Sequence, residues 1–307
     1  MPAVAVAVYW PLIVVLGGFR SDHMLVGILV LVLAYSGRTP QRWLRFLLPL
    51  VLTGVAYDLQ RYYPAFLRGR IRIAEPYEFE QAVFGIQAAE GLLTLNEWWQ
   101  LHTSPFLDLV AGFCYLVFIP QFVLTAAVFT FVTAARGTSR RPSSFVRRKA
   151  PEVMWALFWL NIAGFITHNV FPVAPPWYVA RFGIDVIRPE VAPDPAGAVR
   201  FDQILGVDYF SDFYGRSVDA FGAIPSLHVA FSALALYYAI RFGAVRALSA
   251  TFFVGMCFSA VYLNHHYLID VVWGVIYALA AGVAVDVFGE LRHRADQSRP
   301  ARSRRIQ

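Results

Sequence analysis

Apolar runs long enough to cross a lipid bilayer recur along this chain, and they limit what it can fold into. Its 307 residues are 58% hydrophobic and only 15% charged. Inside a bilayer every backbone N–H and C=O must be satisfied within the protein, which for runs of this length means helices. We therefore predict an all-α, polytopic membrane bundle of about eight spans, or six to eight because the first two runs are short. The expected spans are residues 3–18, 22–36, 43–58, 106–134, 152–171, 224–241, 247–264 and 267–288.

Basic residues predict how these spans are oriented. They cluster in the connection 136–149, in the short link that carries Arg241 and Arg246, and in the tail. The positive-inside rule places these segments and both termini in the cytoplasm, and it places the connections 59–105 and 172–223 outside. The first of these outer connections also carries arginines, but long loops follow the charge rule weakly. Those arginines are Arg61, Arg68, Arg70 and Arg72.

We expect one membrane domain with three parts. Residues 1–105 supply N-terminal spans and an outer interfacial segment, in which 78–102 is interpreted as a helix lying in the membrane interface. Residues 106–288 form the transmembrane bundle with the outer loop 172–223, and residues 289–307 form a basic cytoplasmic tail. The basic residues adjoin apolar spans, so nucleic acid is not an expected partner. The tail is expected to set topology, with contacts to anionic lipids as a second role.

Two histidines and an aspartate stand at the ends of apolar spans. His228 and His266 are 38 residues apart, with two apolar spans and one inside turn between them. At roughly 1.5 Å per residue each span crosses most of the hydrocarbon layer, so the chain goes in and returns. Both histidines are therefore expected on the same outer face, with Asp270 at the same level.

This combination suits phosphoryl transfer through a histidine nucleophile. Asp270 follows His266 by four residues and can hold one imidazole N–H, which leaves the other nitrogen free to attack phosphorus. His228 can protonate the departing oxygen and then deprotonate an incoming alcohol or water. Pro225 suits the first turn of the following helix, where Ser226 and free N–H groups favour a phosphate. The alternative is that each histidine only satisfies local hydrogen bonds at a helix end.

The same segments resemble a known family. Pro225–His228 and His266–Asp270 are similar to the second and third motifs of the type 2 phosphatidic acid phosphatase superfamily. The resemblance covers roughly residues 152–288, the last four spans, which would then be the catalytic core. It implies that the histidine of the earlier motif is the acid/base and that the histidine of the later motif is the nucleophile, supported by its aspartate.

Departures from the family pattern indicate a branch within it. Leu227 stands where the family has glycine, and Ala260 stands where it has an arginine that grips phosphate. The family's first motif, which runs from Lys to Arg-Pro, is not found, and the outer loop opens instead on Phe171–Tyr178. That opening, together with Gly222–His228 and His265–Asp270, resembles the inositol phosphorylceramide synthase branch. The resemblance implies a headgroup transferase.

Other residues then have to contact the substrate. Arg181 and Arg216 in the outer loop are the expected phosphate contacts, although they could instead pair with loop acids. His265 is expected to line the same pocket, or to be only an interfacial neighbour of the nucleophile. Trp177 and Tyr178 could hold a headgroup, but aromatic residues at this depth commonly anchor helix ends. The sequence leaves both roles open for all five residues.

The preferred function is a membrane lipid phosphotransferase at the outer leaflet of the cell membrane, with a phospholipid and a lipid alcohol as substrates. By resemblance, inositol phosphate is the leading headgroup. A lipid phosphate or pyrophosphate phosphatase is the first alternative, because the same site can use water as the acceptor. A non-catalytic transporter or scaffold is the alternative from another class, but transporters typically show repeats and polar breaks at mid-membrane. We predict no metal and no cofactor, and the oligomeric state stays open.

Overall fold

The computed structural model describes residues 2–16, 18–63 and 69–298. The chain divides into two compact units, Met1–Pro64 and Ala65–Gln307. The boundary predicted at residue 105 differs from this division, because the structure groups 69–105 with the unit that carries the bundle. Arg68 and the tail residues 299–307 lie outside the described part of the chain.

The first unit consists of α1 (Pro2–Val15), α2 (Ser21–Tyr35), α3 (Arg38–Leu59) and the 3₁₀ turn η1 (Gln60–Tyr62). α2 packs against both α1 and α3. A charge cluster joins the start of α2 to the end of α3: Asp58 accepts a hydrogen bond from Arg20 at 2.9 Å and contacts the buried ring of His23 at 2.9 Å. These three helices coincide with the first three predicted spans.

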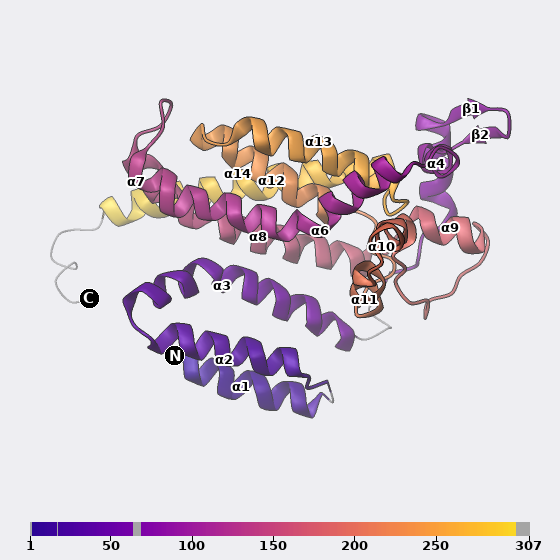
Figure 1. Cartoon of the computed structure of the whole chain (residues 1–307). Helices are drawn as coiled ribbons and strands as arrows, with labels where there is room; N and C mark the ends of the chain where they lie inside the picture. The colour runs from indigo at the N-terminus through magenta and orange to yellow at the C-terminus, as the bar shows by residue number, and fades with distance from the viewer. Residues whose placement is uncertain (1, 17, 64–68, 299–307) are drawn as a thin grey trace. The chain divides into compact units, whose positions relative to one another are not determined.

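The second unit contains a helical bundle. Its helices are α6 (Pro105–Ala127) with its continuations η3 (Val128–Thr133) and α7 (Ala134–Arg136), α8 (Ser143–Val170), α12 (Leu227–Phe242), α13 (Arg246–Tyr262) and α14 (Leu268–Ser298). Figure 1 shows these helices running alongside one another, with α12 packed against α6, α8, α13 and α14. The predicted predominance of helix is confirmed for the described residues.

Some of these helices are long and apolar enough to cross a membrane by themselves. Within the described ranges they are Pro105–Arg136, Ser143–Val170 and Leu268–Ala295. α1, α2, α12 and α13 are shorter apolar helices, and α3 is in neither group. Candidate membrane helices are therefore present, while eight full crossings stay a prediction.

Local sequence determines where the central helix α12 begins and ends. The side chain of Ser226 caps its N-terminus by accepting the N–H of Val229 at 3.4 Å, and Gly243 ends it with a φ of 73°. Pro225 therefore precedes the cap. The sequence predicts it in the first turn of the helix, and the structure places it one residue before the cap. At Gly274 of α14 a Cβ would lie 2.5 Å from the Ser226 carbonyl oxygen, so a glycine is needed for these two helices to approach.

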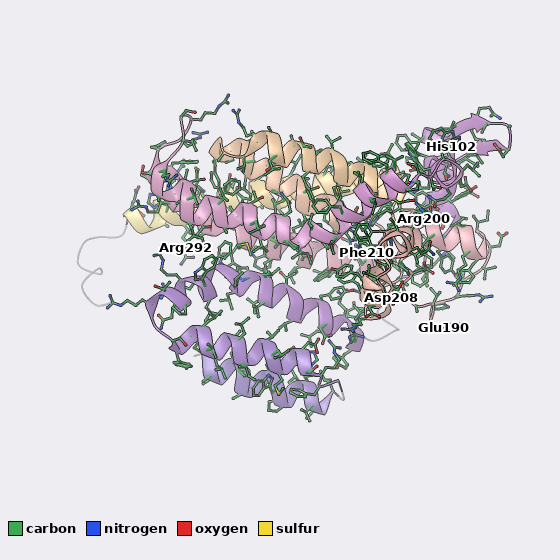
Figure 2. The ribbon with its side chains drawn as sticks, in the orientation of Figure 1. His102, Glu190, Arg200, Asp208, Phe210 and Arg292 are labelled. Atoms are coloured by element: carbon green, nitrogen blue, oxygen red, sulfur yellow. The ribbon has the colours of Figure 1, made fainter. Side chains whose placement is uncertain are left out.

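Shorter elements gather at one end of the bundle, where α12 and α14 begin (Figure 1). They are α4 (Ala74–Phe84), β1 (Ile86–Ala88), β2 (Gly91–Leu93), α5 (Leu95–Leu101), α9 (Pro176–Phe182), η4 (Ala196–Ala198), α10 (Val199–Leu205) and α11 (Tyr209–Gly215). In Figure 2, His102, Arg200 and Phe210 lie at this end, and Arg292 of α14 lies at the opposite end.

Residues 78–102 do not form the interfacial helix that the sequence predicts. β1 and β2 form an antiparallel hairpin between α4 and α5, in which Ile86 pairs with Leu93. Gly91 follows the turn with a φ of 115°, a conformation that other residues rarely adopt. α4 packs against α14, and α5 packs against α13. The segment therefore braces two bundle helices at the end where the histidines lie.

Candidate active site

The two histidines of the predicted site meet at this end of the bundle. His228 lies in the first turn of α12, and His266 lies two residues before α14. The Nδ1 atom of His228 is 3.4 Å from the Nε2 atom of His266. His266 is buried, and His228 is only half-buried. The structure thus brings together the two residues that the sequence selected for the reaction.

Asp270 contacts His266 less directly than the sequence predicts. Its Oδ2 lies 3.6 Å from the His266 Nδ1, which is longer than an ordinary hydrogen bond, and accepts the N–H of Tyr267 at 2.8 Å. The His266 Nδ1 lies closer to the carbonyl oxygen of Ala223, at 3.0 Å. Because α14 begins at Leu268, His266 stands outside the helix and does not share a helical face with Asp270.

The Ala223 contact fixes which nitrogen of His266 can attack. A carbonyl oxygen only accepts hydrogen bonds, so Nδ1 of His266 must carry a proton and donate it. The lone pair of the neutral ring is then on Nε2, which faces His228. The Asp270 carboxylate is fully buried beside the ring and would stabilise a positive charge on it. The ring is therefore oriented for nucleophilic attack through Nε2.

Aromatic rings that the sequence analysis did not single out hold the histidines. Tyr115 of α6 stacks on His228, with ring centroids 4.3 Å apart and planes inclined by 19°, and on His265 at 5.3 Å. Tyr214 also stacks on His265 at 4.8 Å, and Phe118 lies against His228 at 4.7 Å. α6 has the composition of a plain apolar span, so no pattern in the sequence distinguished Tyr115 from its neighbours.

His265 is a neutral member of this aromatic group. Its Nε2 donates to the carbonyl oxygen of Pro195 at 3.0 Å. Burial, with the neighbouring His266 ring as a second cause, lowers the pKa of His265 to about 3. The ring therefore stays uncharged at physiological pH. Its stacking on Tyr115 places it in the group that surrounds His228, next to the predicted nucleophile.

A further histidine supports the turn that leads into α12. The Nε2 of His168, at the end of α8, donates to the carbonyl oxygen of Pro225 at 3.1 Å, and its Nδ1 is 3.4 Å from Asp219. A Cβ on Gly222 would come within 2.7 Å of the same ring, so the turn passes close to it. His168 thus holds Pro225 and the chain that enters the Ser226 cap.

The predicted phosphate contacts lie in different settings. Arg181 is largely exposed and pairs with Asp194 at 2.9 Å, which is the loop-acid alternative that the sequence left open. Arg216 follows α11 as its C-terminal cap residue. For both residues a phosphate contact stays a prediction. A third loop arginine, Arg200, donates to Asp108 of α6 at 2.6 Å and so ties α10 to the bundle.

Trp177 and Tyr178 are buried in the outer loop. They are 6% and 0% exposed and pack in a hydrophobic cluster with Ile73 and Phe221. The hydroxyl of Tyr178 donates to the carbonyl oxygen of Val186 at 2.8 Å. These contacts give both side chains a packing role, and a headgroup contact stays a prediction.

The acidic residues of the outer loop serve local structure where their contacts are defined. The Asp202 carboxylate accepts the N–H groups of Phe210 and Ser211, at 2.9 and 3.1 Å, and so caps α11. Among the described residues, no group of three or more His, Cys, Asp or Glu is arranged to hold a metal ion. Metal-independent chemistry stays a prediction from the sequence.

Comparison with known proteins decides the family. The model of the PAP2 superfamily matches residues 85–284, a range that includes His228, His266 and Asp270. The chain belongs to the PAP2 superfamily. The family predicted from the motifs is thus confirmed, and the match begins well before residue 152, where the sequence resemblance was expected to start.

Two relatives locate this PAP2 protein within the superfamily. Over 268 residues it is 34% identical to the phosphoinositol dihydroceramide synthase of Bacteroides thetaiotaomicron, covering 85% of this chain and 83% of the relative. Over 230 residues it is 28% identical to the inositol phosphorylceramide synthase catalytic subunit of Saccharomyces cerevisiae, covering 74% of this chain and 52% of the relative. The match therefore spans about half the length of the yeast protein. No solved structure matches the chain.

Replacement of Asp270 by asparagine in this PAP2 protein is expected to lower the turnover rate by about 10- to 100-fold. The same change in a serine-protease triad costs about 10⁴-fold, largely because the histidine adopts the wrong tautomer. Here the Ala223 carbonyl also fixes the tautomer, so the loss comes mainly from weaker stabilisation of the charged ring. Steady-state turnover in vesicles measures the effect, with Asp212→Asn as the matched control because Asp212 is exposed. A loss near 10⁴-fold would show that Ala223 does not hold the tautomer.

Proposed function

We propose that this PAP2 protein is a membrane phosphotransferase that moves inositol phosphate from a phospholipid to a ceramide-like lipid alcohol. Its relatives in Bacteroides and yeast are named as synthases of phosphoinositol dihydroceramide and inositol phosphorylceramide. The observation that carries the proposal is the 3.4 Å approach of the His228 Nδ1 to the His266 Nε2. Two-step transfer needs a nucleophile and an acid/base that can both reach one phosphorus, and this distance allows it.

The first half-reaction breaks the bond between phosphorus and the donor lipid. The Nε2 of His266 attacks phosphorus, a P–N bond forms, and the P–O bond to the diacylglycerol oxygen breaks. His228 donates a proton to that oxygen, and diacylglycerol leaves. The Nδ1 proton of His266 stays on the ring, where it is donated to the Ala223 carbonyl, and Asp270 stabilises the positive ring.

The second half-reaction regenerates the enzyme. His228, now neutral, removes the proton of the acceptor hydroxyl, and the alcohol oxygen attacks the same phosphorus. The P–N bond breaks and the electron pair returns to Nε2 of His266. The headgroup is then attached to the acceptor lipid, and both histidines are back in their initial protonation states. The reaction consumes no metal, redox equivalent or external base.

The proposed membrane placement puts this site at the outer leaflet of the cell membrane, with eight spans and both termini in the cytoplasm. Arg292 of α14 lies at the end of the bundle opposite His102 (Figure 2), and the basic link between α12 and α13 follows the end of α12, opposite the first turn that carries His228. At that end Lys149 donates to the backbone carbonyl of Asp286 at 2.9 Å, and Arg241 lies 2.8 Å from the Asp286 carboxylate. Positive charge at one end and the histidines at the other support this orientation.

The proposal is tested with purified protein in vesicles that contain a mixed phospholipid extract and an added ceramide, with His266→Ala as the control. Mass spectrometry follows every phosphorus-containing product. We expect a new lipid in which ceramide carries inositol phosphate, with an equal amount of diacylglycerol, and neither product in the control. Release of inorganic phosphate alone would establish the phosphatase alternative. Turnover that is unchanged in the control would contradict catalysis at this site.

A further inference from the structure

A buried carboxylate from a distant part of the chain binds the start of α14. Glu80 of α4 is 0% exposed. Its Oε1 accepts the backbone N–H of Leu268 at 2.8 Å, and its Oε2 accepts that of Ile269 at 3.3 Å. The first N–H groups of a helix have no partner within the helix, and the positive end of the helix dipole favours a carboxylate there. Glu80 therefore supplies a cap to the helix that carries Asp270.

Glu80 shares this helix start with Asp270 itself. The Asp270 carboxylate accepts the N–H of Tyr267 at 2.8 Å, so two carboxylates together bind three consecutive backbone N–H groups. These three residues directly follow His266. A displacement of their backbone would move the His266 ring relative to Ala223 and to His228.

A second contact from the same segment holds the other side of His266. The amide nitrogen of Asn96, in α5, donates to the carbonyl oxygens of His266 and Val261, each at 2.9 Å. Asn96 is 1% exposed. The helices α4 and α5 thus bind the chain from the His266 carbonyl to the Ile269 N–H, and α4 lies outside the matched family region, which begins at residue 85.

The surroundings of Glu80 contain acidic and phenolic groups. Tyr77 and Glu97 face this region from α4 and α5, and Tyr267 and Asp270 face it from the start of α14. Among the described residues, no nitrogen of an arginine, lysine or histidine side chain lies close enough to the Glu80 carboxylate to form an ion pair. Burial, opposed by the two N–H contacts and reinforced by Asp270, raises the pKa of Glu80 to about 7.

We propose that ionised Glu80 is a positioning residue of the transfer reaction, which fixes the backbone of Tyr267–Ile269 and through it the geometry of His266 and Asp270. The expected effect on the reaction rate rests on the proposed function. The claim that Glu80 fixes the backbone after His266 rests only on its two hydrogen bonds. Glu80 touches neither substrate nor the reacting nitrogen in this role. It acts through the backbone that follows the nucleophile.

The variant Glu80→Gln tests this role, because it keeps the shape of the side chain but replaces one acceptor oxygen with an NH₂ group. An NH₂ group cannot accept a backbone N–H, so one of the two contacts is lost. We expect kcat to fall by about 10- to 100-fold with KM little changed, since small displacements of a catalytic group have effects of this size. Glu75→Gln is the matched control, because Glu75 is an exposed residue of the same helix.

The pH profile separates positioning from general stability. Protonation of Glu80 removes one acceptor, so wild-type kcat should fall as the pH decreases through about 7. Glu80→Gln, whose side chain does not titrate, should lack that acid limb. Folding raises the pKa of Glu80 from 4.5 to about 7, so ionisation costs stability that accumulates between these two pH values and is complete above the higher one. Glu80→Gln removes this cost and is therefore not expected to lower the thermal unfolding temperature.

Amide hydrogen exchange gives a readout that does not depend on activity. Exchange in a peptide that covers residues 262–272 should be faster in Glu80→Gln than in the wild type or Glu75→Gln. Unchanged exchange would overturn the proposal, whichever reaction the protein catalyses. Faster exchange with wild-type kcat and pH profile would also overturn it. Faster exchange in a protein whose wild type shows no headgroup transfer would leave Glu80 as the helix brace and reject the proposed function instead.

Discussion

Replacement of His266 by alanine is expected to reduce lipid headgroup transfer by at least about 10⁴-fold, because removal of a catalytic nucleophile or its base has effects of that size or larger. The loss follows from the role of a single atom, the Nε2 of His266. Nδ1 is committed to the Ala223 carbonyl, so Nε2 is the nitrogen with a free lone pair, and it faces His228. Without it no P–N bond can form, and water or alcohol would have to attack the phosphodiester directly.

A covalent intermediate is the second expected result for His266. Incubation of the wild-type protein with a donor labelled at phosphorus, in the absence of acceptor, should give labelled protein whose label is lost in acid and stable in base, as for phosphohistidine. The His266→Ala variant should carry no such label. Label that persists in this variant would assign the nucleophile to another residue and contradict the proposed first half-reaction.

Controls have to separate loss of chemistry from loss of fold, because His266 is only 5% exposed. His266→Gln preserves more of the side-chain volume and should be equally inactive. His102→Ala is the matched control, because His102 is an exposed histidine at the same end of the bundle (Figure 2). All variants should unfold at similar temperatures. An inactive His102→Ala variant would show that alanine substitution at this end damages the fold in general.

Much of this site could be predicted from the sequence because helix geometry constrains it strongly. Two apolar helices of similar length joined by a short turn must bring their outer ends to one level, which places His228 near His266. The motif around Asp270 then supplies a carboxylate within four residues of the second histidine. Apolar runs also located the bundle helices, since a bilayer leaves the backbone few alternatives to a helix.

The supporting contacts could not be predicted, because they depend on which distant segments pack together. Glu80 lies 188 residues before the N–H that it binds, and nothing in its own neighbourhood indicates a helix cap. The acceptor on Ala223 is a backbone carbonyl, which every residue has. Tyr115 stands in an apolar run where aromatic residues are common. Tertiary structure alone selects these groups from many equivalent ones.

The outer loop shows how a local pattern can suggest the wrong environment. Trp177 and Tyr178 follow two prolines at a helix end, a position typical of interfacial aromatic residues. In the structure the loop folds back, with Val173 bridging both Arg72 and Gly222, so both rings become enclosed. The segments around Arg72 and Gly222, far apart in the sequence, flank Val173 and enclose the two rings. Hydropathy along the chain cannot predict which distant segments pack together.

Replacement of His228 is expected to reduce transfer by about 10²- to 10⁴-fold, the range that general acid–base catalysis supplies. His228 is half-buried, and its Nδ1 is 3.4 Å from the attacking nitrogen. In the first half-reaction it protonates a lipid alkoxide, which is a very poor leaving group without a proton. In the second it removes a proton from the acceptor alcohol. Both half-reactions therefore require it, whereas only the first requires His266 as an attacking group.

A donor with a better leaving group separates these two roles. An inositol phosphodiester of a nitrophenol releases an anion that needs no proton. With this donor, His228→Ala should form labelled protein at close to the wild-type rate, because His266 remains intact. Transfer to ceramide should still be slow, because no base activates the alcohol. Labelled protein should therefore accumulate in this variant and turn over quickly in the wild type.

The accumulation distinguishes an acid/base from a residue that only shapes the site. Tyr115 and Phe118 pack against the His228 ring, so its removal could also disturb their positions. His228→Gln, which retains a polar side chain of similar size, should show the same rescue by the nitrophenyl donor as His228→Ala. If both variants are equally slow with the natural and the activated donor, leaving-group protonation is not the role of His228. The defect would then lie in the packing of the aromatic group, and the acid/base would have to be sought elsewhere in the site.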